Sequence, residues 1–260
     1  MQFRNRNTII ASAFILLVVA AGTAAGVPYW KAQTAKSNEL PPLPEPERVS
    51  ENDMRILEEL GGVLKKIDSL NAFETAGSIR VSDPDEGEQS LEYHYAKRDS
   101  LSYYKLGQQE TLSNGKIVVM ADHYAEKLFV TPAGQTPKAG FMPAGDQLAA
   151  FLTGEGYAIR KSETDGMRYI ELTRPNHINY KVYRIGYDDA GLVRESFIRM
   201  TDISHPLDTS RDRIIRTSAD RWIVGRPPTD LFDIYRLIKE EGGSYVPMPA
   251  YQHYDIILTQ

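Results

Sequence analysis

The chain has 260 residues, of which 42% are hydrophobic and 25% charged, a balance typical of globular proteins that argues against wholesale disorder and coiled coils. It contains no cysteine, which excludes disulfides, thiolate metal sites, cysteine nucleophiles and an acyl-cysteine membrane anchor. The formal net charge of −5 disfavours a protein that binds nucleic acid or anionic membranes by neutralising phosphates. Tyrosine is unusually frequent, with 15 residues against 8 Phe and 2 Trp.

Residues 1–30 carry an export signal. No residue between Arg6 and Lys31 is charged, so the basic end should stay in the cytoplasm while the rest of the chain is exported. Two interpretations remain open. The short apolar stretch 9–20, followed by small residues, fits a cleaved signal peptide, whereas its continuation to Trp30 fits a retained membrane anchor. In both cases we expect a periplasmic location, either free or anchored to the inner membrane.

Two further segments follow the export signal. Residues 31–49 contain four prolines among small and charged residues, which predicts an extended linker. Residues 50–260 then form the predicted folded domain, which is long enough to bury a substantial core.

The folded part begins with a predicted amphipathic helix over about residues 51–70. Ser50 and Asp53 form a capping-box pattern at its start. Leu57, Leu60, Leu64, Ile67 and Leu70 recur at helical spacing, with Glu58, Glu59, Lys65 and Lys66 on the opposite side.

Alternating segments separated by short turns then predict an antiparallel meander. A segment rich in Pro and Gly at 131–145, which leads into a predicted short helix at about 146–152, interrupts it. We expect strands at 73–81, 91–98, 101–106, 110–113, 116–120, 127–130, 157–163, 168–174, 180–187, 192–202, 211–217 and 221–224, and a final strand at 251–258.

Near the C-terminus, Thr229 is expected to cap a helix over about 230–241, which Gly242 and Gly243 would end. Together these elements predict an α+β fold: a large curved antiparallel sheet, a half-barrel of about ten or more strands, with helices covering its concave face.

Several motifs resemble the LolA/LppX-like superfamily of periplasmic lipoprotein carriers. The first helix leads into the sequence SLNAFET at 69–75, and a strand at 103–106 precedes the hairpin LSNGKIVVM at 112–120. The hairpin YDDAGLV at 187–193 and the segment PTDLF at 228–232 are similar to later elements of that superfamily. The resemblance covers about residues 50–240.

The resemblance implies a half-barrel whose apolar concave face binds the acyl chains of a lipid or lipoprotein. A retained anchor would depart from the soluble carriers, which diffuse between membranes, and would suit a sensor or an acceptor at one membrane. The extension from 243 to 260 has no clear counterpart in the superfamily.

The two-residue repeat of strands places aromatic and aliphatic side chains on shared faces. Ordinary core packing is one interpretation of these side chains, and a lipid-binding lining is the other. The expected lining residues are Leu57, Leu64, Phe73, Ile79, Tyr93, Tyr95, Tyr103, Ile117, Val119, Leu128, Phe151 and Leu152.

The sequence offers little for catalysis. It contains no nucleophile elbow, phosphate-binding loop, dinucleotide fingerprint or HExxH motif. The five histidines are dispersed, so we expect structural roles for them and no metal site. The acidic segment 82–88 contains carboxylates of the kind that bind calcium, but it lacks the spacing of an EF-hand loop. Its proline and glycine predict a solvated hairpin tip instead. We therefore expect a protein that is not an enzyme and uses no cofactor.

Two functions remain open at this point. The first is an envelope protein that binds acyl chains without covalent chemistry. The alternative is a membrane-anchored module for protein interaction or envelope-stress regulation, whose sheet is filled by its own side chains. Expected partners are lipid or lipoprotein acyl chains, possible envelope proteins, and the membrane itself if the N-terminal segment is retained.

Overall fold

The computed structural model describes residues 50–133 and 155–259. The predicted export signal and linker, and the predicted helix at 146–152 with its preceding segment, lie outside these ranges. Within the described ranges, no helix is long and apolar enough to cross a membrane.

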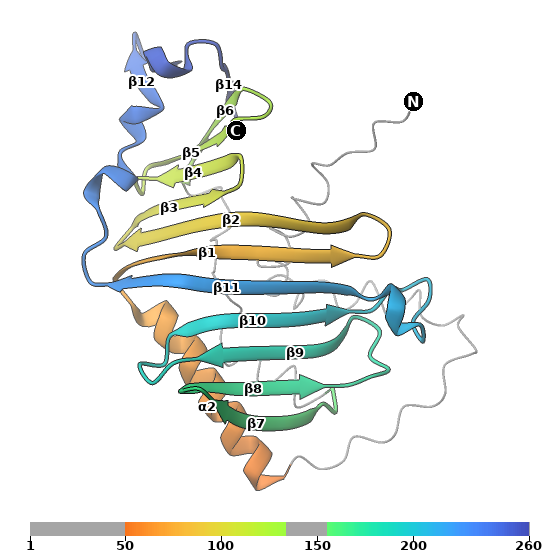
Figure 1. Cartoon of the computed structure of the whole chain (residues 1–260). Coiled ribbons are helices and arrows are strands. Elements are labelled where there is room, and N and C mark those ends of the chain that lie inside the picture. Colours follow the sequence, from red (N-terminus) through yellow and green to blue (C-terminus); the bar gives the residue numbers. More distant parts are fainter. Residues whose placement is uncertain (1–49, 134–154, 260) are drawn as a thin grey trace. The chain divides into compact units, whose positions relative to one another are not determined.

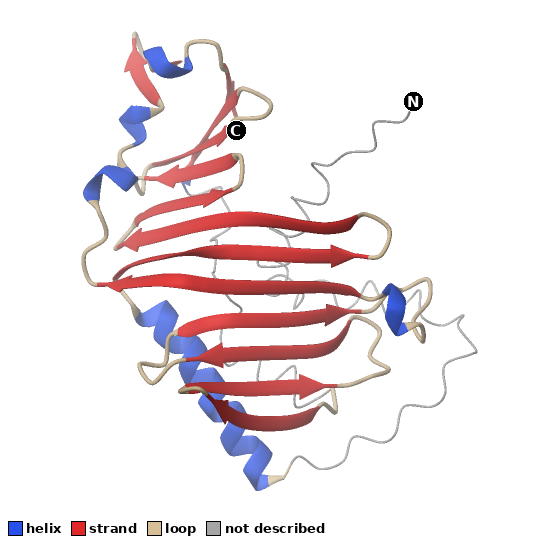
Figure 2. Cartoon of the chain, in the orientation of Figure 1, coloured by secondary structure: helices blue, strands red, loops and turns tan. Residues whose placement is uncertain are grey.

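The described residues form one α-helix, fourteen strands and several short 3-10 helices (Figures 1 and 2). The helix is α2 (Glu51–Ser69), and the strands are β1 (Ala72–Asp83), β2 (Gly87–Arg98), β3 (Leu101–Leu106), β4 (Gln109–Ser113), β5 (Ile117–Asp122), β6 (Lys127–Pro132), β7 (Ala158–Thr164), β8 (Met167–Thr173), β9 (Tyr180–Tyr187), β10 (Val193–Met200), β11 (Arg213–Val224), β12 (Ile238–Glu241), β13 (Ser244–Pro247) and β14 (Asp255–Leu258).

Twelve strands belong to one hydrogen-bonded sheet, in the order β14-β6-β5-β4-β3-β2-β1-β11-β10-β9-β8-β7. The sheet is not closed, and its described ladders are antiparallel except for the parallel pair β14 and β6. The predicted fold class, α+β with a large open antiparallel sheet, is confirmed. The described residues separate into two compact units, one formed by residues 50–69 with 155–193 and the other by residues 70–133 with 194–259.

The first unit contains α2 and the strands β7, β8 and β9. Ser50 accepts a hydrogen bond from the Asp53 amide at 3.1 Å, which is the N-cap bond of the predicted capping box, and its hydroxyl donates to the Asp53 carboxylate at 2.8 Å. The helix crosses one face of the three strands (Figure 1). The buried side chains of α2 are Ile56, Leu57, Leu60, Val63, Leu64 and Ile67.

The strand register of this unit places its apolar side chains on the face that α2 covers. Lys161 is opposite Ile170, and Ile170 is opposite Ile185. Ile170 and Ile185 are fully buried, whereas the neighbouring positions on these strands point to the other face, which carries Arg184 and Glu171. One apolar face of a three-stranded ladder and one apolar face of a helix therefore make the core of the first unit.

The second unit contains β1 to β6, β10, β11 and residues 225–259, which we call the C-terminal segment. Strands predicted separately at 211–217 and 221–224 are one long strand, β11, which pairs with β1 through a bulge at Asp220. The bulge accommodates the extra residue without ending the ladder. The predicted final strand at 251–258 is shorter than expected, because η6 (Pro249–Tyr251) turns the chain before β14 begins at Asp255.

The predicted helix over 230–241 is wrong. Residues 229–236 form two short 3-10 helices, η4 (Thr229–Phe232) and η5 (Ile234–Arg236), and β12 follows. Gly242 and Gly243, with φ of 61° and 79°, are the two central residues of a hairpin that joins β12 to β13. Two successive positive φ angles suit a two-residue hairpin turn, so the glycines that suggested a helix end instead reverse a strand.

This C-terminal segment fills one face of β3 to β6. The core cluster on that face joins strand residues to the side chains of η4, η5 and β12. Its buried members are Ala96, Tyr103, Leu112, Val119, Ala121, Leu128, Val130, Phe232, Ile234, Leu237 and Ile238.

Candidate functional site

The first unit holds an open cavity of about 540 Å³ between α2 and β7. We call it the α2/β7 cavity. It lies at β7, the last strand in the sheet order of the described residues. Its lining residues are Asn52, Arg55, Ile56, Glu59, Ile159, Arg160 and Lys161.

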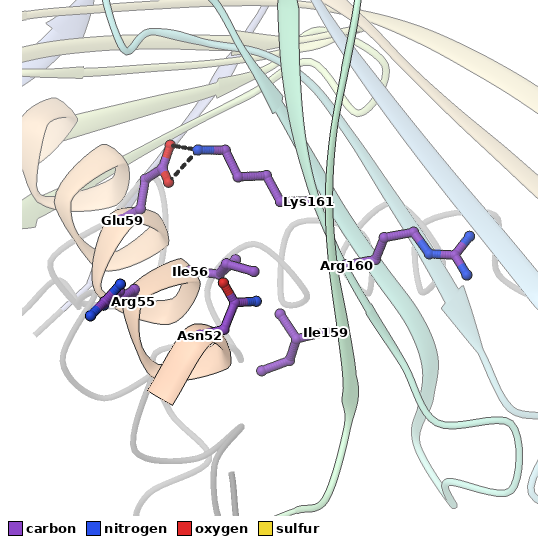
Figure 3. A pocket seen from close by; sticks show the side chains of 7 residues that line it. All are labelled: Asn52, Arg55, Ile56, Glu59, Ile159, Arg160 and Lys161. Atoms are coloured by element: carbon purple, nitrogen blue, oxygen red, sulfur yellow. Dashed lines mark hydrogen bonds and ion pairs between the residues drawn. The ribbon is translucent and has the colours of Figure 1, made fainter. Parts of the chain in front are cut away.

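Helix and strand periodicity bring these side chains together. Ile56 and Glu59 are three residues apart, so both project from the same side of α2. Ile159 and Lys161 are two residues apart and share one face of β7. Figure 3 shows these four side chains directed into the space between helix and strand, whereas the Arg160 guanidinium extends to the other side of β7.

An ion pair joins the two walls of the cavity. Lys161 Nζ lies 2.8 Å from Glu59 Oε1 and 2.6 Å from Oε2, and the Tyr187 hydroxyl on β9 also donates to Glu59 Oε1. Burial alone would raise the pKa of Glu59, but the hydrogen bonds from Lys161 and Tyr187 and the positive charges of Lys161 and Arg168 together lower it. Glu59 is therefore a carboxylate near neutral pH, with Lys161 as its direct counterion.

The lowered pKa of Glu59 predicts a pH-dependent stability. The contribution is fully present above the ordinary value of 4.5 and is lost as the pH falls through the lower pKa of the folded state. Because the pair is partly exposed, we expect Glu59→Gln to cost about 0.5 kcal/mol at pH 7 and almost nothing at pH 3. Urea unfolding of both proteins across this range measures the difference. Lys161→Gln should flatten the same dependence, and a wild-type dependence that persists in Lys161→Gln would contradict the assignment.

The predicted lining residues of the helix lie in the core of the first unit. Leu57 and Leu64 are each 1% exposed, so they are packed against protein and not open to the cavity. Ile56, one residue from Leu57, lines the cavity instead. Phe151 and Leu152 lie outside the described residues.

The register divides the other predicted lining residues between two faces of the sheet. Gly77, Tyr93 and Leu106 are paired across β1, β2 and β3, so these three positions share one face of the sheet. Tyr103 is three residues before Leu106 on β3 and therefore points to the opposite face. One face therefore carries Phe73, Ile79, Tyr93 and Tyr95, and the opposite face carries Tyr103, Ile117, Val119 and Leu128.

The two faces have different surroundings. Tyr103, Val119 and Leu128 belong to the core that the C-terminal segment fills, and Ile117 packs against it. On the other face, the Phe73 ring lies 5.4 Å from Tyr95 and 5.3 Å from Trp222, centroid to centroid. A lipid-binding role for either set stays a prediction.

Sequence reasoning missed the residues that form the cavity. Glu59 was assigned to the polar side of the helix, but the structure turns it toward the sheet. The available signal was its position three residues after Ile56, at the border of the apolar face. Lys161 had no local signal, because its partner lies 102 residues away in the chain.

Other polar clusters are engaged in structural contacts. In the acidic turn at 82–88, Asp83 bonds to Arg213 at 2.7 Å and Asp85 bonds to Arg211 at 3.0 Å. His94 lies 2.9 Å from Glu74. The described part of the chain has no group of three or more His, Asp or Glu side chains placed to hold a metal ion.

No family model and no curated protein sequence matches the chain. Among solved structures, the chain is similar to a LolA superfamily protein from Nitrosomonas europaea, with 15% identity over 70% of this chain and 98% of that one and a TM-score of 0.33. It is also similar to LprF from Mycobacterium bovis, with 12% identity over 70% and 97% of the chains and a TM-score of 0.37. A third is a domain from Vibrio parahaemolyticus described as outer membrane lipoprotein-sorting, with 8% identity over 68% and 95% and a TM-score of 0.28.

Proposed function

We propose that this protein is a non-catalytic protein of the cell envelope that binds an acyl chain of a lipid or lipoprotein in the α2/β7 cavity. The single observation that carries the proposal is the cavity itself, which is open to solvent and has an isoleucine on each wall. Its volume of about 540 Å³ lies within the range of about 300–1,000 Å³ that small-molecule sites occupy.

The chemistry of the walls supports an apolar ligand held without covalent bonds. Ile56 and Ile159 contribute apolar surface from the helix and from the strand. Burying a chain methylene there is worth about 0.8 kcal/mol, so about ten methylenes supply about 8 kcal/mol, which corresponds to micromolar binding before the entropic cost of association is subtracted. The export signal predicted for residues 1–30 places this ligand in the periplasm, where the protein would act free or anchored to the inner membrane.

Equilibrium binding of a neutral probe, radiolabelled palmitoylglycerol, to the full chain tests this function. We expect saturable binding by the wild type. Ile159→Trp places a large side chain in the cavity and should weaken binding at least about tenfold, since it removes room for a methylene or two. Ile178→Trp is the matched control, because Ile178 is 42% exposed outside the cavity.

Native mass spectrometry of the full chain extracted from its own membranes provides the independent measurement. A bound amphiphile in the wild type that is depleted in Ile159→Trp supports the proposal. A wild-type chain that carries no lipid and binds no palmitoylglycerol overturns it.

A further inference from the structure

The α2/β7 cavity combines two isoleucines with polar side chains, and Asn52 lies beside the isoleucines (Figure 3). Ile56 and Ile159 face each other next to the pair formed by Glu59 and Lys161 (Figure 3). An amphiphile whose chain lies against the isoleucines would bring its polar group to this ion pair. The ion pair is therefore the place where a head group meets the protein.

The charges of the cavity walls favour an anion. Arg55 and Lys161 line the cavity against one carboxylate, Glu59, whereas the Arg160 guanidinium extends to the other side of β7 (Figure 3). Arg168 adds a further positive charge near Glu59, although it is itself bonded to Asp189 at 2.6 Å. Opposite charge attracts a carboxylate or phosphate to such a rim and repels a cationic head group.

Lys161 can be reached by a ligand. Its side chain is 38% exposed and that of Glu59 is 32% exposed, so neither group is sealed in the protein. An exposed pair of this kind is held together by only a modest free energy. An incoming anion can therefore take the place of Glu59 on the Lys161 ammonium.

Glu59 would not be left unbonded by this exchange. The Tyr187 hydroxyl donates to Glu59 Oε1 independently of Lys161, and because the Glu59 side chain is 32% exposed, water can donate to the carboxylate in place of Lys161. A carboxylate or phosphate that reaches Lys161 would form a charge-assisted hydrogen bond with its ammonium group, and such bonds are stronger than those between neutral groups. The carboxylate of Glu59 thus has the position and chemistry of a ligand head group.

We propose that Lys161 is the head-group site for an anionic amphiphile, and that Glu59 is an internal anion that occupies Lys161 until the ligand displaces it. This inference rests on the proposed acyl-chain binding in the same cavity and adds the chemical class of the ligand. A fatty-acid carboxylate and the phosphate of a phospholipid share the chemistry that the site would recognise.

Equilibrium binding to the full chain tests the assignment with three probes of the same chain length. They are neutral palmitoylglycerol, palmitate, and palmitoyl lysophosphatidylglycerol, so that the carboxylate and phosphate sources are measured separately. We expect Lys161→Gln to weaken binding of at least one anionic probe about threefold and to leave the neutral probe unchanged. Glu59→Gln should strengthen binding of that anionic probe about threefold, because the internal competitor is neutralised.

Arg184→Gln is the matched control for Lys161→Gln. Arg184 pairs with Glu171, and the two side chains are 40% and 33% exposed, almost the same as in the cavity pair. The Arg184 pair lies on the face of the strands away from α2, so this variant should not alter binding of any probe.

The outcomes separate the two proposals. If all three probes bind equally and neither cavity variant changes their affinities, the head-group assignment is overturned while acyl binding stands. If no probe binds, acyl binding itself is overturned. Apolar surface exposed by misfolding would strengthen binding of the neutral probe as well, so a gain of Glu59→Gln that is confined to the anionic probe distinguishes recognition from structural damage. Weakening of anionic binding by Arg184→Gln to the same extent as by Lys161→Gln would also overturn the assignment.

Discussion

Gly77→Ala should destabilise the second unit by more than about 4 kcal/mol, the largest effect expected of a single methyl group in this chain. A Cβ at Gly77 would overlap the carbonyl oxygen of Ser218 and lie 2.8 Å from its carbonyl carbon and 3.0 Å from the Cα of Ala219. All three are backbone atoms of β11, so no side-chain rotation can relieve the overlap. The bulge at Asp220 on β11, beside Gly77, accounts for this close approach, and its geometry would have to change.

Gly62→Ala is the control for this prediction. Gly62 lies within α2, and a Cβ there would meet no atom within 4 Å. Alanine has a higher helix propensity than glycine, so this variant should gain about 0.5–1 kcal/mol. Urea unfolding monitored by circular dichroism measures both changes. Equal midpoints for Gly77→Ala and the wild type would contradict the close approach of β1 and β11.

Arg236→Met should lower the free energy of unfolding by about 3 kcal/mol, because it leaves a buried carboxylate without its cation. Glu110 on β4 is 4% exposed and forms an ion pair with Arg236 at the end of η5. The Arg236 guanidinium also lies 5.5 Å from the centre of the Tyr103 ring. These contacts attach the C-terminal segment to the sheet at the edge of the apolar core.

His123 also contacts Glu110 but is not its counterion in the wild type. Its Nε2 lies 3.3 Å from Glu110 and its Nδ1 lies 2.9 Å from the Tyr254 hydroxyl. Burial lowers the pKa of His123, and the positive charge of Lys105 lowers it further, although Asp122 partly opposes the shift. In the wild type the ring is therefore neutral at pH 7, so His123 shares a hydrogen bond with Glu110 while Arg236 is the counterion of Glu110.

Two comparisons make this prediction specific. The double variant Glu110→Leu with Arg236→Met removes both charges and should recover most of the lost stability, since an apolar pair can replace a buried ion pair. Arg184→Met breaks the exposed pair with Glu171 and should cost less than about 1 kcal/mol. Denaturant unfolding at pH 7 measures all three variants. A cost for Arg236→Met no larger than that for Arg184→Met would show that the Glu110 pair does not hold the C-terminal segment.

Most of the strands could be predicted from the sequence because their signals are local. The strands 101–106 and 180–187 have the predicted bounds, since each is limited by a turn whose residues identify it. The pattern of Ser50 and Asp53 likewise predicted the start of α2, where the two residues are joined by hydrogen bonds. Antiparallel pairing followed from the short connections, which leave no room for crossovers.

The parallel pairing of β14 with β6 could not be predicted in this way. The hairpin of β12 and β13 and then η6 precede β14, and the direction in which the chain returns depends on how that segment packs on the core. Phe232, Leu237 and Ile238 are as compatible with a helix as with short turns and a strand when only their spacing is considered. Their burial against β3 to β6 selected the second arrangement.

The sequence by itself determined the antiparallel meander, the amphipathic helix and the apolar and polar periodicity of each element, because caps, turns and two-residue or helical repeats act over a few residues. Only the tertiary structure decided which strand faces are filled by the chain itself and which residues surround the α2/β7 cavity. Glu59 and Lys161 are separated by 102 residues, and their pairing arises because α2 packs across the strands that begin with β7. Packing between residues this far apart in the chain does not affect their local spacing. The proposed head-group site therefore depends on the packing of α2 against β7 and could not be predicted from the sequence.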